Sequence, residues 1–178
     1  ADSHIMELPN FLIDYADASI RDQLRPVSYS ASLVTDEEVA AILANGGRHT
    51  PEHVEAQIAL GDRLIATSKE IQALGAFDRD DRSVALDMLG FRKQLVFATH
   101  SVATPFSPSR KLSNELRYGA TRAHNRAMSE FCAADDRLMG VGIVPLEDPD
   151  NAMIELEFAL DAELEAIWVP HHPAGERS

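Results

Sequence analysis

The second half of the chain alternates between two patterns of apolar residues. Short runs in which nearly every residue is apolar predict buried strands over 94–99, 138–146 and 166–170. Between these runs, apolar residues recur at helical spacing, which predicts helices over 115–134 and 148–163, the second with Asp148 as its N-cap. Because helices alternate with short apolar strands, we expect a parallel sheet that is covered by helices.

The residues before this alternation predict mainly helices. Residues 1–6 are expected to end a first short strand, and residues 9–24 show helical spacing of apolar side chains. Residues 81–89 predict a short helix that ends at Gly90. The chain is therefore expected to contain about four strand–helix units.

The segment 27–77 is expected to be a large, mostly helical insertion. Thr35 and Glu38 have the spacing of a capping box, so a helix is predicted to begin there. Thr50 precedes a proline and an acidic residue, which is typical of another helix start. Apolar residues are expected to carry this second helix as far as Gly75. The insertion is interpreted either as a lid or as an oligomer surface.

Composition narrows the class of protein. The 178 residues, 45% hydrophobic and 25% charged, are typical of a soluble globular protein with a single domain over 1–178. A net charge of −13 argues against nucleic-acid binding, and no cationic membrane anchor is present. No apolar run predicts a membrane span, and the start is too polar for a signal peptide. With Cys132 as the only cysteine, no intrachain disulfide can form, and we expect a cytoplasmic protein.

The glycine pattern and the length exclude some folds. No glycine-rich phosphate loop follows any predicted strand, which disfavours a Rossmann or P-loop nucleotide site. A closed barrel of eight strand–helix units needs about 250 residues. The pattern therefore predicts the front half of a larger α/β architecture.

Three stretches of the sequence resemble one family. The opening "DSHIMELPNFLIDYADASIRDQL" resembles the start of the amidohydrolase-related, metal-dependent barrel family, which includes metal-dependent hydrolases and aminocarboxymuconate-semialdehyde decarboxylase-like enzymes. The stretch "LGFRKQLVFAT" is similar to the family's entry into its second strand. Residues 123–170 are similar to a later segment, in which Asn125, "RLMG" at 137–140 and "PLEDP" at 145–149 match the family pattern. The resemblance covers nearly the whole chain except the insertion.

The resemblance implies a fold and a metal centre. The implied fold is a (β/α)8 TIM-barrel type, of which this chain covers about the first four units plus the helical insertion. The implied cofactor is a divalent metal, with zinc expected. The family's later histidine ligands and its catalytic aspartate lie in the second half of the barrel. The catalytic residue is therefore expected beyond the end of this chain.

The stretch "DSH" has two interpretations. Residues two apart on a strand point to the same face, so Asp2 and His4 would both point into a barrel at the carboxyl end of its first strand. The resemblance places them as metal ligands. From spacing alone, Asp2 is a helix cap and His4 a solvated residue near the terminus. Glu7 is interpreted either as a carboxylate that orients His4 or as an acid near a helix start.

Other polar residues follow the predicted strands. His100 follows the strand 94–99, and His171 and His172 follow the strand 166–170. Strand-to-helix loops are where barrel enzymes bind substrates, so these histidines, with Arg177, are candidate substrate contacts. The alternative for each is an ordinary polar loop residue. The sequence shows no local base partner for Ser3, Ser101 or Cys132, and Asn125 is interpreted as a structural hydrogen-bonding residue.

The resemblance implies a metal-dependent hydrolase that acts on a small carboxylic acid, amide or lactone-like substrate. The alternative within the family is a non-oxidative decarboxylase. An alternative of another class is a catalytically silent half barrel that needs a partner segment; a further one is a barrel that binds its ligand without metal. The expected partners are a small-molecule substrate and further copies of the chain, with neither nucleic acid nor membrane.

Overall fold

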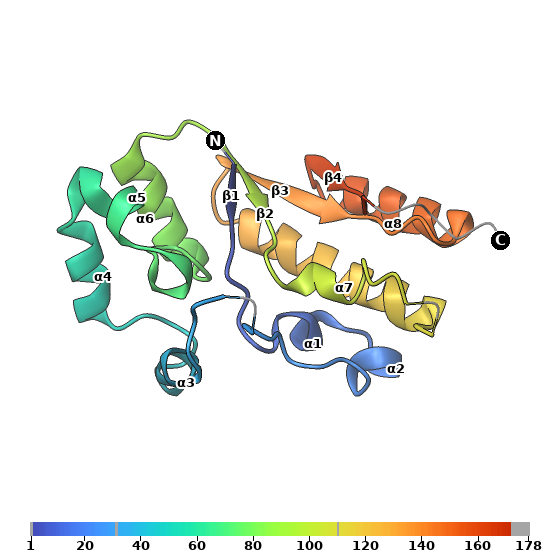
Figure 1. Cartoon of the computed structure of the whole chain (residues 1–178). Coiled ribbons are helices and arrows are strands. Elements are labelled where there is room, and N and C mark those ends of the chain that lie inside the picture. The colour runs from blue at the N-terminus through green and yellow to red at the C-terminus, as the bar shows by residue number, and fades with distance from the viewer. Residues whose placement is uncertain (1, 31, 110, 172–178) are drawn as a thin grey trace.

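The structure of the chain, a computed structural model, describes residues 2–30, 32–109 and 111–171. These residues form a four-stranded parallel sheet in the order β1-β2-β3-β4 (Figure 1). The strands are β1 (Asp2–His4), β2 (Gln94–Phe97), β3 (Leu138–Ile143) and β4 (Ala166–Trp168). The predicted parallel α/β arrangement is therefore confirmed, as an open sheet whose edges are β1 and β4.

Two long helices connect the last three strands, as predicted. They are α7 (Asn114–Cys132) and α8 (Pro149–Asp161). The Asp148 carboxylate accepts the N–H groups of Asp150 and Asn151, each at 3.1 Å, so the expected N-cap of α8 is confirmed. The main core lies between the sheet and these helices and contains Ile5, Leu86, Val96, Ala98, Met128, Phe131, Cys132, Leu138, Ala159 and Leu164.

The helix predicted over residues 9–24 is divided into two short helices. They are α1 (Phe11–Tyr15) and α2 (Ala18–Arg21), with extended backbone between them. Leu12 and Ile20 both pack against the small residues of α7. Because of this break, both α1 and α2 contact the surface of α7. A single straight helix over the same residues would lose contact with α7 at one of its ends.

The insertion before β2 contains several short helices rather than two long ones. Their bounds are α3 (Asp36–Ala44), α4 (Pro51–Ile58), η1 (Gly61–Arg63), α5 (Leu64–Thr67) and η2 (Glu70–Gln72). After the insertion, α6 (Arg79–Leu89) ends before Gly90, which confirms the short helix predicted over 81–89. Thr35 and Glu38 form the predicted capping box. The expectation that one helix runs from Pro51 to Gly75 is wrong, because Gly61 (φ 54°) and Glu70 (φ 51°) have left-handed backbone.

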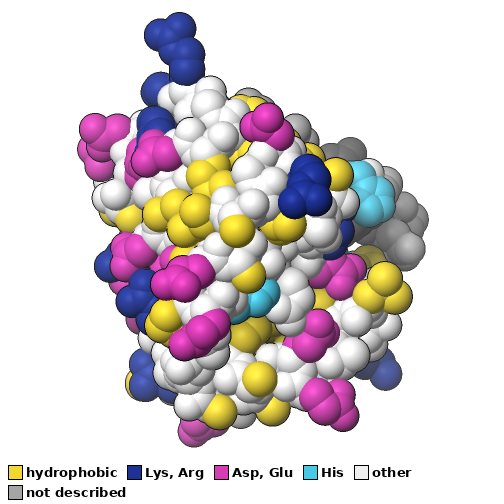
Figure 2. Space-filling model, turned by 90° about the vertical axis from the view of Figure 1, so that its left-hand side faces the viewer, with side chains coloured by type: hydrophobic (Ala, Val, Ile, Leu, Met, Phe, Trp, Pro, Cys, Tyr) yellow, Lys and Arg dark blue, Asp and Glu magenta, His cyan; other side chains and the backbone are white. Residues whose placement is uncertain are grey.

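The insertion stands beside β1, away from β4 (Figure 1). Acidic, basic and apolar side chains are interspersed over the face that Figure 2 shows. One further short helix, η3 (Ser101–Ala103), follows β2. Among the described residues, no helix is both long and apolar enough to span a membrane.

Candidate functional site

His4 ends β1 at the carboxyl edge of the sheet, and its side chain is exposed. Its Nδ1 atom lies 2.8 Å from the carbonyl oxygen of Ala98, just past the end of β2. Because a carbonyl oxygen can only accept, Nδ1 carries the proton and Nε2 retains a lone pair. The ring also stacks on Phe97, with 5.6 Å between ring centroids. This orientation by a backbone carbonyl is the one that metal-binding histidines usually have.

Asp2 precedes His4 by two positions on the same strand. Asp2 pairs with Leu95 and His4 with Phe97, so the backbone places both residues on the same face of the sheet. The Asp2 side chain lies outside the part of the chain that the structure describes. The pairing of Asp2 and His4 as ligands therefore stays a prediction.

Glu7 is buried and holds the loop that follows β2. Its side chain is 1% exposed, and its carboxylate accepts the backbone N–H groups of Thr99, His100 and Ser101 at 2.9–3.1 Å. The expected bond from Glu7 to His4 is not among the hydrogen bonds of the described residues, and the Ala98 carbonyl orients His4 instead. Glu7 thus shapes the carboxyl edge by fixing the backbone around His100.

His100 faces the same region as His4. Its ring makes an edge contact with Tyr29, with 5.3 Å between ring centroids. Tyr29 in turn donates its hydroxyl proton to the Glu7 carbonyl oxygen at 2.5 Å. His100 Nε2 is buried and has no hydrogen-bond partner among the described residues. Burial, with the nearby Glu7 charge, raises the pKa of Tyr29 well above its usual range, so its hydroxyl remains a donor.

His4 and His100 line one cavity of about 750 Å³ beside β1. The other residues that line it are Ser3, Met6, Ser32, Ile65, Ser68, Lys69, Glu70, Ala73, Leu74, Ala76, Arg82 and Thr99. Polar groups come from β1, the loop after β2, the insertion and α6, and most of the apolar wall comes from the insertion. Sequence reasoning did not single out Arg82, because nothing near it in the sequence marks a site.

A second polar pair lies deeper, behind the β2 loop. Ser101 Oγ and His124 Nδ1 are 2.9 Å apart, and both side chains are buried. Burial lowers the pKa of His124 to about 4, against the opposing effects of the Glu7 charge and the Val141 carbonyl. The sequence shows no local base partner for Ser101, and the structure brings His124 to it from α7, 23 residues away in sequence. The pair does not line the cavity beside β1.

The residues after β4 are placed apart from this cavity. His171 is exposed in the loop after β4 and does not line it. His172 and Arg177, also candidate substrate contacts, lie outside the described residues.

Asn125 is buried and binds the backbone at the end of β3. Its amide group donates to the Ile143 carbonyl at 3.1 Å and accepts the Ile143 N–H at 2.9 Å. This confirms its predicted structural role.

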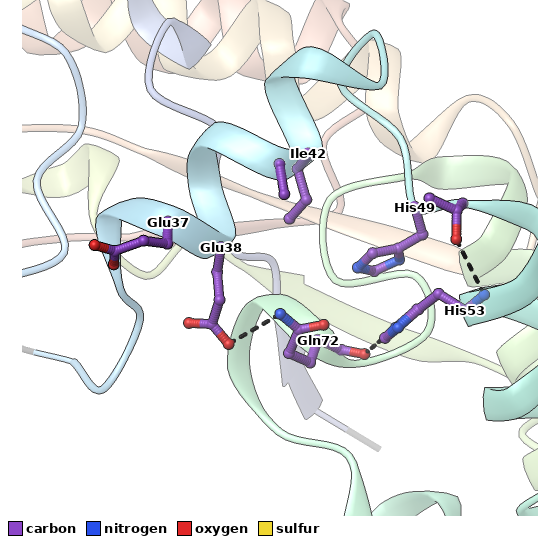
Figure 3. A pocket seen from close by; sticks show the side chains of 8 residues that line it. Glu37, Glu38, Ile42, His49, His53 and Gln72 are labelled. Atoms are coloured by element: carbon purple, nitrogen blue, oxygen red, sulfur yellow. Dashed lines mark hydrogen bonds between the residues drawn. The ribbon is translucent and has the colours of Figure 1, made fainter.

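The insertion contains another cavity, of about 380 Å³, between α3 and α4 (Figure 3). His49 and His53 stack in its wall, with 4.2 Å between ring centroids. Each Nε2 atom donates to a backbone carbonyl, His49 to Ile71 and His53 to Gln72, both at 2.9 Å. His49 is buried, with 8% of its surface exposed.

The described residues show no group of three or more His, Cys, Asp or Glu side chains close enough to hold a metal ion. No protein-family model and no curated protein matches the chain. The candidate site is therefore the carboxyl edge of the sheet. There, His4 has the tautomer of a metal ligand and shares a cavity with His100.

Proposed function

We propose that the chain carries part of a metal-dependent hydrolytic site of the amidohydrolase-related type. The observation that supports it most is the His4 side chain. Its Nδ1–H is held by the Ala98 carbonyl at the carboxyl edge of a parallel sheet, which leaves Nε2 as a ligand atom. Asp2, on the same face of β1, would supply a carboxylate oxygen.

When bound, a divalent ion such as zinc would polarise a substrate carbonyl or lower the pKa of a bound water molecule. The residues of this chain would orient the reactants. Ala98 fixes the His4 ring, and Glu7 fixes the backbone on either side of His100. The proposed substrate is a small carboxylic acid, amide or lactone-like molecule. Decarboxylation of a small carboxylic acid uses the same ligand positions and stays the alternative.

We also propose that the sheet belongs to a (β/α)8 barrel. Four parallel strands in sequential order, with helices between β2, β3 and β4, are the arrangement of half such a barrel. Four further strands, running from the free edge of β4 round to the free edge of β1, would complete it. The exposed Met153, Ile154 and Leu160 side chains on α8 favour association, either with further copies of this chain or with a completing segment.

Metal content measured by inductively coupled plasma mass spectrometry tests this proposal. In a complete barrel, which supplies the remaining ligands, we expect about one divalent ion per chain, and loss of that ion in the double variant Asp2→Ala/His4→Ala. His53→Ala is the matched control, because it removes a histidine that is bound to a backbone carbonyl elsewhere. Its metal content should equal that of the wild type.

Two results would contradict the proposal. A complete wild-type protein that stays metal-free when supplied with zinc would favour a barrel that binds without metal or a silent half barrel. Equal metal loss in the His53→Ala control would show that the ion lies elsewhere. Sedimentation velocity on the same samples separates a silent assembling half, which forms dimers without metal, from a metal-loaded site.

A further inference from the structure

Residues 68–74 of the insertion form a strap between two cavities. Gln72 lines the cavity of about 380 Å³ that His49 and His53 also line (Figure 3). Other residues of the strap line the cavity of about 750 Å³ beside β1, namely Ser68, Lys69, Glu70, Ala73 and Leu74. A movement of the strap would therefore change the walls of both cavities.

Two stacked histidines hold the middle of the strap. His49 Nε2 donates to the carbonyl oxygen of Ile71, and His53 Nε2 donates to that of Gln72, each at 2.9 Å. The two imidazole rings are 4.2 Å apart between centroids and are inclined by 31°. Because the two carbonyl groups are consecutive along the chain, both bonds can be kept only while the rings stay stacked.

The remaining contacts of the strap do not involve histidine. At its start, the Ser68 hydroxyl donates to the side chain of Gln57 on α4. In its middle, the Gln72 side-chain amide donates to the Glu38 carboxylate at 2.9 Å. Ile71 is only 1% exposed, so opening of the strap costs apolar burial. The closed strap therefore predominates at neutral pH, and opening is a minor excursion.

The stacked pair has room for one positive charge. In the neutral pair each Nε2 carries the proton that it donates, so an added proton goes to Nδ1. Asp81 Oδ2 lies 3.9 Å from His49 Nδ1 and offers a counter-charge to a first added proton. A second proton would place like charges on rings that are 4.2 Å apart, one of which is shielded from water.

The carboxylates on the α3 side of the cavity add little further compensation. Glu38 already accepts the Thr35 N–H and the Gln72 side-chain amide, each at 2.9 Å. Glu37 is exposed, as is Glu52 on α4, so water screens the charges of both side chains.

On the α6 side, Asp81 is the carboxylate that faces the pair. Asp78 and Asp80 form ion pairs with Arg48, at 2.8 Å and 3.3 Å. Burial raises the pKa of the Asp81 carboxyl, so acid weakens this counter-charge as well. Burial also lowers the pKa of His49, against the effect of its bond to a backbone carbonyl.

We propose that the stacked pair of His49 and His53 is an acid-sensitive latch for residues 68–74. The closed strap holds at most one added proton on the pair. In the open strap the rings separate, each takes a proton from the solvent, and the carbonyls of Ile71 and Gln72 turn to water. Opening therefore takes up about one proton, which makes it about tenfold more frequent for each pH unit below about 6.5.

The latch lies within the insertion and at the start of α6. It uses no group of β1, so it is compatible both with the open sheet and with a closed barrel. Opening of the strap needs neither metal nor substrate. Its consequence for catalysis, a wall around His4 and His100 that loosens in acid, rests on the proposed function.

Amide hydrogen exchange of the 178-residue chain, followed by nuclear magnetic resonance, tests the latch. The N–H groups of Gln72 and Ala73 are bonded only within a single 3₁₀ turn, to Lys69 and Glu70, and such a turn is not stable alone. After division by the intrinsic exchange rate at each pH, we expect their protection to fall by about tenfold between pH 7.5 and pH 5.5. The Ile143 N–H reports global unfolding and should stay about tenfold better protected at both pH values.

His53→Gln removes one charge from the pair and keeps a donor for the Gln72 carbonyl. In this variant the fall in protection over the same pH range should be less than about threefold. His171→Gln, which changes an exposed histidine after β4, is the matched control and should keep the pH dependence of the wild type.

Imidazole titration of the wild type decides the question if His53→Gln alters the fold. The signals of His49 and His53 should shift in two separate steps, because the pair titrates as a unit. The second step should coincide with the loss of protection in the strap.

Several results would overturn the latch. One is equal protection of the strap amides at pH 7.5 and pH 5.5, and another is unchanged pH dependence in His53→Gln, which would make burial of His49 alone sufficient. Titration of both histidines in one step near pH 6.5, with the strap still protected, would have the same meaning. Loss of the pH dependence in His171→Gln would show that acid acts on the whole protein. No metal is added in these measurements, so their failure is distinct from failure of the metal test.

Discussion

Ser101 and His124 form a hydrogen bond of 2.9 Å inside the protein, between the loop after β2 and the middle of α7. His124 is fully buried, and Ser101 is 2% exposed. The bond joins two elements that are 23 residues apart in sequence, at the base of the loop that presents His100. It therefore couples the carboxyl edge of the sheet to the helix that covers it.

Removal of this bond should destabilise the fold. Ser101→Ala leaves His124 Nδ1 buried without its partner, so we expect a loss of about 1–3 kcal/mol in the free energy of unfolding. Urea denaturation followed by circular dichroism measures it. Ser109→Ala, in an exposed loop, is the control and should change stability by less than about 0.5 kcal/mol. Equal stability of the Ser101→Ala protein would show that the bond contributes little.

The low pKa of His124 predicts that acid destabilises the protein. Its pKa is about 4 in the folded state and about 6.5 in the unfolded chain, so the unfolded state binds the proton more readily. The free energy of unfolding is therefore unaffected by the titration of His124 above about pH 6.5. It falls as the pH decreases towards 4, by roughly 3 kcal/mol in all. Burial also lowers the pKa of His49, which acts in the same direction.

Nuclear magnetic resonance of the imidazole signals tests this directly. The His124 signals should not titrate between pH 5.5 and 8, whereas an exposed histidine should titrate near 6.5. A His124 midpoint above pH 6 would contradict the prediction.

Glu7→Gln should loosen the loop that follows β2. A carboxylate accepts the three N–H groups of Thr99, His100 and Ser101, and an amide has a single oxygen with which to do so. We expect a loss of about 2–4 kcal/mol and faster hydrogen exchange at these three amides. Glu37→Gln is the matched control on an exposed helix position. Unchanged exchange at residues 99–101 would refute this role for Glu7.

Gly75→Ala should be more damaging than an alanine at another glycine with positive φ. Gly75 has φ 72°, and a Cβ there would lie 2.4 Å from the Arg82 Cα atom. We expect a loss of about 2–4 kcal/mol, because backbone must move as well as adopt a left-handed conformation. Gly61 has φ 54°, and a Cβ there would meet open space, so Gly61→Ala should lower the free energy of unfolding by about 1 kcal/mol. Thermal denaturation measures both variants. An equal loss of stability in Gly75→Ala and Gly61→Ala would contradict the close approach of Gly75 to the Arg82 backbone.

The position of the proton on the His4 ring can be tested without metal. The Ala98 carbonyl should hold the neutral ring with its proton on Nδ1. Long-range nitrogen–proton correlation spectra at pH 8 distinguish the two tautomers. A His4 ring with its proton on Nε2 would remove the main support for a ligand role.

The sequence by itself determined the local elements. Apolar runs located β2, β3 and β4, and the capping residues Thr35 and Asp148 marked helix starts, because these signals act within a few residues. The prediction of one helix that reaches Gly75 was wrong, since the left-handed backbone at Gly61 and Glu70 depends on packing within the insertion.

Only the tertiary structure decided which polar groups meet. Glu7 reaches the amides after β2, and Ser101 meets His124, because parallel strand pairing and helix packing join segments that are distant in sequence. The sequence did not predict that Arg82 lacks a counter-charge among the described residues, because acidic residues lie close to it along the chain. Burial against β1 separates it from those acids, since a counter-charge acts through space and not along the chain.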